Sequence, residues 1–146
     1  MENFEKVGGC VLFGKESLDT VLAQEIKEGK RELEPLKSFS KLEGIPFNIL
    51  EDTNVVSEIE IHINMADLWH CIEGEVTFTL GGTPVEPYKK VNKDGSLSET
   101  EIRAERVDGS DEKVLRPGDW LWIPAGVPHS HKTTGTARLV IIKVPQ

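Results

Sequence analysis

Residues 118–131 read "GDWLWIPAGVPHSH" and hold two of the four histidines of the chain. The opening run "DWLWI" is rich in residues that favour a β-strand, and "PAGVP" follows it. Because proline fixes φ and glycine permits backbone conformations that other residues avoid, "PAGVP" predicts a rigid turn. Side chains two residues apart in a strand point the same way, so His129 and His131 should share one face of the next strand. A rigid turn that delivers imidazole groups to a fixed point is typical of a metal site.

A second polar cluster lies in "SEIEIHIN", residues 57–64. Its alternation places three isoleucines on one strand face and four polar residues on the other, namely Glu58, Glu60, His62 and Asn64. Such a strand by itself favours a surface position with its isoleucines inward. The same pattern fits a strand whose polar face lines a barrel interior, provided that the isoleucines are covered from outside. The presence of two histidine clusters in one chain favours the barrel interior.

The pattern along the chain predicts a single domain, residues 1–146, in which a strand and a helix precede a β-rich core. An apolar strand is expected at 7–13, and apolar residues at helix spacing predict an amphipathic helix over 17–32. Further along, short strand-like runs between Gly and Pro turns indicate an all-β sandwich or closed barrel. Residues 83–113 are highly charged and are expected to form a solvated hairpin or loop excursion.

The composition excludes several classes of partner. The 146 residues carry a formal net charge of −8, with 38% hydrophobic and 29% charged residues, as in an ordinary globular domain. This charge argues against nucleic acid and anionic membrane surfaces as partners. The first residues lack the features of a signal peptide, and no stretch approaches the roughly 20 apolar residues that span a bilayer. With only Cys10 and Cys71, the chain is expected in the cytoplasm with both thiols reduced.

The stretch at 118–131 strongly resembles the second motif of the cupin superfamily, G-x5-P-x-G-x2-H-x3-N. The motif positions are occupied by Gly118, Pro124, Gly126 and His129, and Thr133 stands where asparagine is usual. The motif is specific, because it sets a histidine at a fixed distance from a proline and two glycines.

Residues 54–74 resemble the first cupin motif, G-x5-H-x-H-x3–4-E-x6-G, more loosely. Gly74 is the closing glycine, and Asp67 takes the glutamate position. His62 and Glu60 take the second and first histidine positions, and an asparagine replaces the opening glycine. The resemblance covers about residues 54–144, the expected barrel core, and leaves 1–53 as an N-terminal extension.

The resemblance implies an all-β fold, an antiparallel jelly-roll β-barrel, with the short N-terminal α-helix outside it. It also implies a divalent metal held by histidines and carboxylates, and on this chain the corresponding ligands are Glu60, His62, Asp67 and His129. This set suits Fe(II), Mn(II) or Zn(II). Cupins are frequently dimeric, and the alternating isoleucines and tryptophans leave more apolar face than one barrel interior needs, so a homodimer is expected.

Two further histidines are rival ligands. His70 follows Asp67 by three residues, so in a regular strand it faces outside if Asp67 faces inside. His131 shares the inward face with His129, and three roles stay open for it: a fourth ligand, a partner that orients a ligand, or a base that contacts substrate.

Aromatic and thiol side chains near the motifs follow the same strand phases. Trp69 and Cys71 share the phase of Asp67 and are candidate pocket lining. Trp120 and Trp122 have the opposite phase from Leu121 and Ile123, so they are expected to cover the outer face of the barrel or a dimer contact.

Two functions stay open. In the first, the chain is a metal-dependent enzyme that acts on a small polar metabolite, with dioxygenase-type chemistry ahead of isomerase or lyase chemistry. Its acid or base is then His131 or a free carboxylate, Glu58 or Glu60. In the second, the barrel is a non-catalytic binding or sensor module with a weak or absent metal site, which the departures in the first motif favour. Either function takes a small molecule as its partner.

Overall fold

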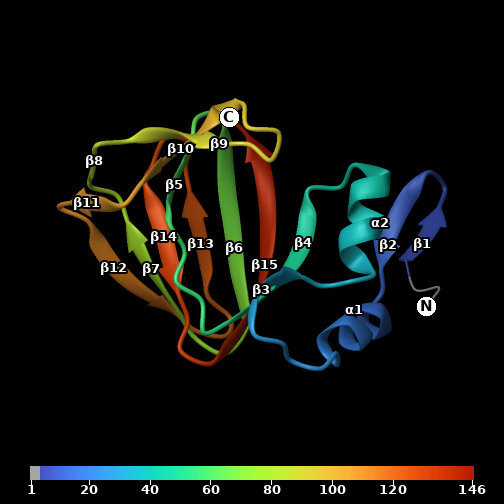
Figure 1. Ribbon diagram of the computed structural model, residues 1–146. Coiled ribbons are helices and arrows are strands. Elements are labelled where there is room, and N and C mark those ends of the chain that lie inside the picture. Colours follow the sequence, from blue (N-terminus) through green and yellow to red (C-terminus); the bar gives the residue numbers. More distant parts are fainter. Residues whose placement is uncertain (1–3) are drawn as a thin grey trace.

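Two antiparallel β-sheets face each other in the structure, a computed structural model that describes residues 4–146 (Figure 1). The larger sheet has the strand order β12 (Asp111–Leu115), β7 (Val76–Leu80), β14 (His129–Lys132), β5 (Ile59–His62), β10 (Leu97–Ala104) and β9 (Tyr88–Val91). The smaller sheet has the order β13 (Trp120–Ile123), β6 (Met65–Glu73), β15 (Thr136–Pro145), β4 (Phe47–Thr53) and β3 (Gly29–Glu32). Neighbouring strands run antiparallel throughout, so the predicted all-β jelly-roll barrel is confirmed.

An N-terminal layer packs against the outer side of the smaller sheet (Figure 1). It consists of β1 (Phe4–Val7), β2 (Cys10–Phe13), α1 (Lys15–Leu22) and α2 (Leu36–Glu43). Its apolar side chains and those of β4 form a cluster of their own, centred on the buried residues Val21, Leu33, Leu36 and Ile49. No helix within residues 4–146 combines the length and the apolar character needed to cross a membrane.

The helix predicted over 17–32 is wrong beyond Leu22, where α1 ends. Residues Gly29–Glu32 form β3 instead, and they pair with β4 so that Lys30 lies opposite Asp52. The apolar spacing of the sequence continues past the helix end, but hydrogen bonding to a strand that comes later in the chain overrides this local preference.

The strand predicted at 7–13 is a hairpin, β1 and β2. Gly8 and Gly9 lie between the two strands with φ values of 58° and 81°, a region that glycine enters without steric cost, so the chain reverses there. Helix α2 was not predicted. It is only eight residues long, between Pro35 and Gly44, and its short apolar pattern is a weak signal.

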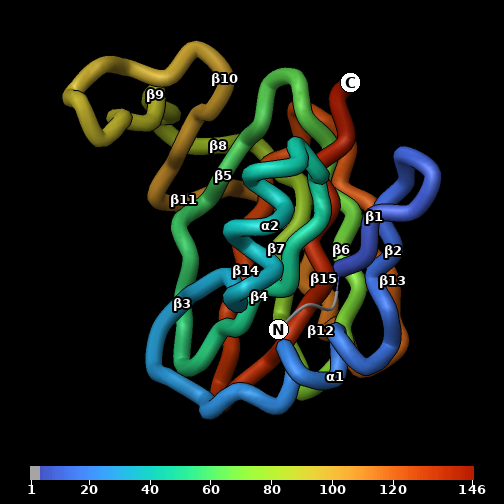
Figure 2. The backbone as a smooth tube through the Cα atoms, turned by 90° about the vertical axis from the view of Figure 1, so that its right-hand side faces the viewer, coloured from blue at the N-terminus to red at the C-terminus, as the bar shows by residue number. Residues whose placement is uncertain are grey.

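The charged segment at 83–113 forms strands. β8 (Thr83–Val85) pairs with β11 (Arg106–Asp108), and β9 and β10 form a hairpin whose loop projects from the body of the barrel in Figure 2. Because β10 also pairs with β5, this segment widens the larger sheet. The smaller sheet likewise takes in β3 and β4, which lie within residues 1–53, the segment expected as an extension.

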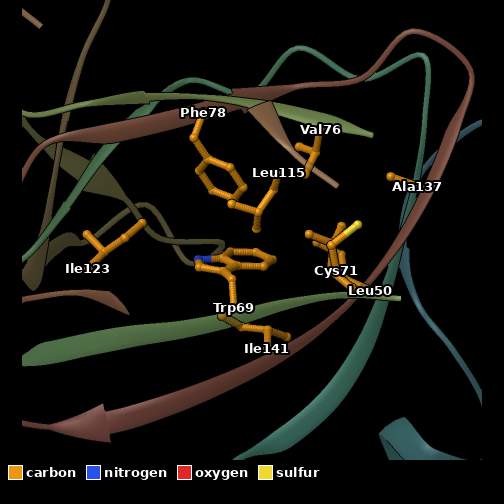
Figure 3. Packing of buried hydrophobic residues seen from close by; sticks show 10 residues of the cluster. Leu50, Trp69, Cys71, Val76, Phe78, Leu115, Ile123, Ala137 and Ile141 are labelled. Carbon is orange, nitrogen blue, oxygen red and sulfur yellow. The ribbon is translucent and has the colours of Figure 1, made fainter. Parts of the chain in front are cut away.

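The space between the sheets is filled by an apolar core around Trp69 (Figure 3). The rings of Trp69 and Phe78 meet edge to face, with centroids 5.5 Å apart. The other buried members are Leu50, Cys71, Val76, Leu115, Ile123, Ala137, Leu139 and Ile141. Burial raises the pKa of the Cys71 thiol, so this cysteine packs as a small neutral hydrophobe. Trp69 and Cys71 therefore face the interior, as their strand phase predicts.

Trp120 and Trp122 lie on the outer face of β13, at the edge of the smaller sheet. They are 59% and 45% exposed, respectively. The strand phase therefore predicts their orientation correctly, and the homodimer that this apolar surface suggests stays a prediction.

A buried ion cluster joins helix α1 to the outer face of the smaller sheet. The Glu51 carboxylate accepts hydrogen bonds from Arg138 Nε at 2.9 Å, Arg138 Nη2 at 2.7 Å and Arg31 Nε at 2.8 Å. Arg138 also donates to the backbone carbonyls of Leu22 and Gln24, at the end of α1 and just after it. The two charged side chains at the centre, Glu51 and Arg138, are 0% and 3% exposed, so their pairing is needed to offset desolvation.

Substitution of Gly74 by alanine should lower the free energy of unfolding by about 3 kcal/mol, the combined cost of a left-handed backbone and an overpacked contact. Gly74 has φ of 72°, and a Cβ there would lie 2.1 Å from the backbone oxygen of Thr136. The matched control is Gly109→Ala, where φ is 75° and nothing lies within 4 Å of an added Cβ. Urea unfolding of both variants measures the difference, and equal losses would contradict the steric argument.

Candidate functional site

Three potential metal ligands meet in the larger sheet. One ligand atom each from Glu60, His62 and His129 lies within 4.8 Å of the other two. Strand pairing explains this, because β5 carries Glu60 and His62 on one face and His129 of β14 lies directly opposite Glu60. The polar face of the isoleucine strand therefore points to the site, while Ile59 and Ile61 are buried on the other face.

Asp67 comes to the same place from the facing sheet. Its Oδ2 atom lies 3.3 Å from His129 Nε2 and 3.6 Å from His62 Nε2. Both Asp67 Oδ2 and His129 Nε2 are buried, and neither has a hydrogen-bond partner among residues 4–146. Two buried polar atoms that face each other without a hydrogen bond are costly unless something else satisfies them, and a cation between them would do so.

The imidazole of His129 is oriented as a metal ligand. Its Nδ1 atom lies 2.9 Å from the backbone oxygen of Val127. Because a carbonyl oxygen only accepts, Nδ1 carries the proton and Nε2 is left with its lone pair toward Asp67 and His62. The backbone that holds this carbonyl belongs to the rigid "PAGVP" turn, so the turn fixes the direction of the ring as well as its position.

The spacing of the ligand atoms is close to that expected around one divalent ion. Ligands that bind a zinc-like ion at about 2.1 Å lie roughly 3.0–3.4 Å from one another. The separation of 3.3 Å between His129 Nε2 and Asp67 Oδ2 lies within this range, and the separations of 3.5 Å between Glu60 Oε2 and His62 Nε2 and of 3.6 Å between His62 Nε2 and Asp67 Oδ2 lie slightly above it. Two imidazoles and carboxylate oxygens form a donor set suited to Fe(II), Mn(II) or Zn(II), so the residues present fit such a metal.

Both carboxylates at the site are held in the ionised form. Burial opposes ionisation of Glu60, but His62, Lys30 and Arg103 outweigh it and lower its pKa to about 2. Burial likewise opposes ionisation of Asp67, but the Lys143 ammonium, 2.6 Å from its Oδ1 atom, holds the pKa of this carboxyl below its usual range. Negative charge is therefore available to a cation at neutral pH.

The sequence did not identify Lys143, Glu101 and Arg103 as members of the site. Lys143 Nζ lies 2.6 Å from Asp67 Oδ1 and 3.5 Å from His62 Nε2. Glu101 Oε1 lies 3.4 Å from His62 Nδ1, and Arg103 Nη2 lies 3.3 Å from Glu60 Oε1. Alternation places Glu101 and Arg103 on one face of β10, but only the pairing of β10 with β5 shows that this is the site face.

The site opens into two hollows. A cleft of about 410 Å³ is lined by residues that include Lys30, Glu60, His62, Glu101, Arg103 and Lys143. A smaller cavity of about 80 Å³ lies toward the core and is lined by residues that include Glu60, Trp69, His129, His131, Ile141 and Lys143. The candidate ligands therefore stand between an open cleft and a small inner cavity, and Glu60 and Lys143 border both.

His131 lies beside the inner cavity, apart from the three-residue ligand cluster. Its Nε2 atom donates a hydrogen bond of 2.7 Å to Asp52 Oδ2, and both side chains are buried. The imidazole also packs against the rings of Trp69 and Phe78 at centroid distances of 5.5 and 5.4 Å. The sequence pattern placed His131 on the inward face but did not indicate Asp52, which precedes both motifs.

Two other candidate residues, His70 and Glu58, lie away from the ligand cluster. His70 is on the outer face of β6, where it stacks on Trp120 at 4.0 Å and its Nδ1 lies 3.2 Å from the backbone oxygen of Asp119. Its strand phase predicted this orientation. Glu58, the candidate acid or base, is 62% exposed at its side chain and pairs with Arg103 at 2.8 Å. Neither hollow is lined by Glu58 in the described chain, so the structure does not bring it to the site.

Comparison with known proteins identifies similar folds only. No protein-family model matches the sequence, and no curated protein matches it. A structure of the protein TT1209 from Thermus thermophilus is 17% identical, with a TM-score of 0.51, and the match covers 88% of this chain and 93% of that one.

Two other solved structures are similar at slightly lower scores. The CENP-C cupin domain of Drosophila melanogaster is 13% identical over 97% of this chain and 69% of its own, with a TM-score of 0.49. A recombinant oxalate oxidase in complex with glycolate is 15% identical over 83% and 52%, also at 0.49. The chain spans about half the length of several of the proteins it matches.

Proposed function

We propose that the chain, which has a cupin-type fold, is a metal-dependent enzyme that acts on a small polar metabolite. The metal would be held by His62, His129 and Glu60, with Asp67 as a further carboxylate ligand. The observation that carries the proposal is the unpaired, buried contact between Asp67 Oδ2 and His129 Nε2, beside two further ligand atoms. The family resemblance and the geometry point to the same four side chains.

The donor set favours iron and oxygenase chemistry among the reactions open to this fold. His62, His129 and Glu60 form a set of two histidines and one carboxylate, which is typical of non-haem Fe(II) oxygenases. With Asp67 as a fourth ligand, a six-coordinate ion would still keep two positions for a substrate. A bound metal of this kind supplies Lewis-acid polarisation and, as iron, activation of dioxygen. The side chains of the cleft would bind and orient the substrate, and the apolar core behind Trp69 would exclude water from the inner cavity.

His131 is the proposed acid or base of this enzyme. Because Asp52 accepts a hydrogen bond from Nε2, Nδ1 is the ring nitrogen left to take a proton and later return it. Asp52 would fix the tautomer and orientation of the ring. His131, which is buried and paired with Asp52, borders the same small cavity as His129, and this favours catalysis over simple binding, since holding a ligand does not require a proton carrier.

The alternative is a non-catalytic ligand-binding or sensor module with a weak or absent metal site. One specific contact favours it, because the Lys143 ammonium already provides a positive charge to Asp67 at 2.6 Å. In that case the lysine would satisfy the carboxylates, and the barrel would bind its ligand without a metal.

Metal titration separates the two functions. Protein stripped with EDTA is expected to bind one equivalent of Fe(II), under anaerobic conditions, or of Co(II). At a free metal concentration 1,000-fold above Kd, its stability should rise by about 4 kcal/mol. Elemental analysis and thermal unfolding give the stoichiometry and the shift. If Fe(II), Mn(II), Co(II) and Zn(II) all leave Tm unchanged, the enzyme proposal is wrong and the sensor module is favoured.

A further inference from the structure

Lys143 stands where its charge competes with that of a metal ion. Its Nζ atom is 2.6 Å from Asp67 Oδ1 and 3.5 Å from His62 Nε2, and these two side chains belong to the proposed ligand set. An ammonium group next to a divalent cation is repelled, and in a partly buried site the repulsion is larger than in water. Metal and ammonium therefore cannot both remain close to Asp67 and His62 without a cost.

The side chain of Lys143 has room to leave this position. It is 41% exposed and borders the 410 Å³ cleft as well as the inner cavity. Lysine has a flexible four-carbon stem, so its ammonium can move several ångströms while the backbone of β15 stays paired to β6. The direction open to it is the cleft.

The side chains around the cleft carry more positive than negative charge even before a metal binds. The basic ones are Lys30, Lys90, Arg103 and Lys143, and the acidic ones are Glu60 and Glu101, with Asp67 beside Lys143. A divalent cation adds two positive charges to this set, in a protein whose formal net charge is −8. The metal-loaded cleft is thus positive, and it favours an anionic ligand.

We propose that metal binding releases Lys143 from Asp67, and that the freed ammonium, with Lys30 at the rim of the cleft, binds the carboxylate of a small anionic substrate. This inference rests on the proposed metal site. It makes Lys143 a specificity-determining residue with two partners, an internal carboxylate in the metal-free protein and a substrate carboxylate in the metal-loaded protein. It also predicts that metal and carboxylate strengthen each other's binding, because coupling between two sites is reciprocal.

Isothermal titration with Co(II) tests both parts, with malonate as the carboxylate probe and malonamide as its uncharged counterpart. In the native sequence, malonate should tighten Co(II) binding roughly tenfold, and malonamide should have no effect. Lys143→Met should bind Co(II) more tightly than the native protein in the absence of malonate, and it should lose the malonate effect. Lys132→Met, which removes the same charge from an exposed lysine next to His131 on β14, should resemble the native protein in both respects.

Each outcome has a separate meaning. Weaker Co(II) binding by Lys143→Met would overturn the competition, since the lysine would then support the site. Equal effects of malonate and malonamide on Co(II) binding by the native protein would show that the ligand need not be a carboxylate. This measurement uses only the native protein, so it does not depend on whether a variant folds. If the native protein does not bind Co(II), the metal site of the proposed function is contradicted, and this inference with it.

Discussion

Replacement of His129 by alanine is expected to weaken Co(II) binding by at least roughly 100-fold. Groups that merely orient a metal ligand cost 10–100-fold when they are removed, so the loss of a ligand should reach at least the upper end of this range. Among the proposed ligands, His129 has a well-defined orientation. Its Nδ1 atom is held by the Val127 carbonyl, and its Nε2 atom lies 3.3 Å from Asp67 Oδ2. Titration of EDTA-stripped protein measures the affinity, and thermal unfolding shows whether the metal still raises Tm.

His70→Ala is the matched control for this variant. It removes the same side chain from the outer face of the barrel, where His70 stacks on Trp120, so it should leave Co(II) affinity unchanged. A variant without His129 that binds Co(II) as tightly as the native protein would show that the ion binds elsewhere. A large loss in His70→Ala would point to the outer surface as that place.

Arg138→Met should lower the free energy of unfolding by about 3–5 kcal/mol, the usual result when one partner of a buried ion pair is removed. Glu51 would keep Arg31 as its only arginine partner, and the carbonyls of Leu22 and Gln24 would lose the donor that joins them to the sheet. Urea unfolding measures the loss. The control is Arg106→Met, because Arg106 and Asp108 form an exposed pair at 3.8 Å that should contribute less than about 1 kcal/mol. Equal losses in the two variants would contradict the role assigned to burial.

The pairing of Glu51 with Arg138 also predicts how the free energy of unfolding changes in acid. Burial opposes ionisation of Glu51, but the hydrogen bonds from Arg31 and Arg138 outweigh it, so its pKa lies below the ordinary value of 4.5. A carboxyl with a lowered pKa stabilises the fold fully above its unfolded pKa and loses this contribution as pH falls through the folded pKa. Arg138→Met should therefore lose less of its free energy of unfolding below pH 4.5 than the native protein does. Its free energy of unfolding near neutral pH should be lower than that of the native protein.

Strand alternation allowed the orientation of several site residues to be predicted from the sequence. His129 and His131 face inward from β14, and His62 and Glu60 share one face of β5, because a period of two needs no knowledge of neighbouring strands. The same rule set His70 on the outside. For "SEIEIHIN" the alternation left two interpretations, and the second motif, with its own inward histidines, selected the correct one.

Local pattern failed where a strand exists only because a distant partner pairs with it. Residues at 29–32 follow a helical apolar spacing that ends at Ile26, and they form β3 because β4 offers them hydrogen bonds. Asp52 on β4 reaches His131 on β14 only because the two sheets face each other across the core. Nothing in the spacing of Asp52 relative to the motifs signals this contact.

Proline, glycine and strand alternation were enough to predict an all-β sandwich or closed barrel in which a rigid turn aims His129 at an interior site, because these signals act over a few residues. The jelly-roll form of the barrel followed only from the resemblance of residues 118–131 and 54–74 to the cupin motifs. The charges that surround the ligands depend instead on the packing of the whole chain. Lys143 reaches Asp67 through the register of β15 on β6, and Glu101 reaches His62 through the register of β10 on β5. Strand register depends on hydrogen bonds between segments far apart in the chain, so the electrostatics of the site became visible only in the folded protein.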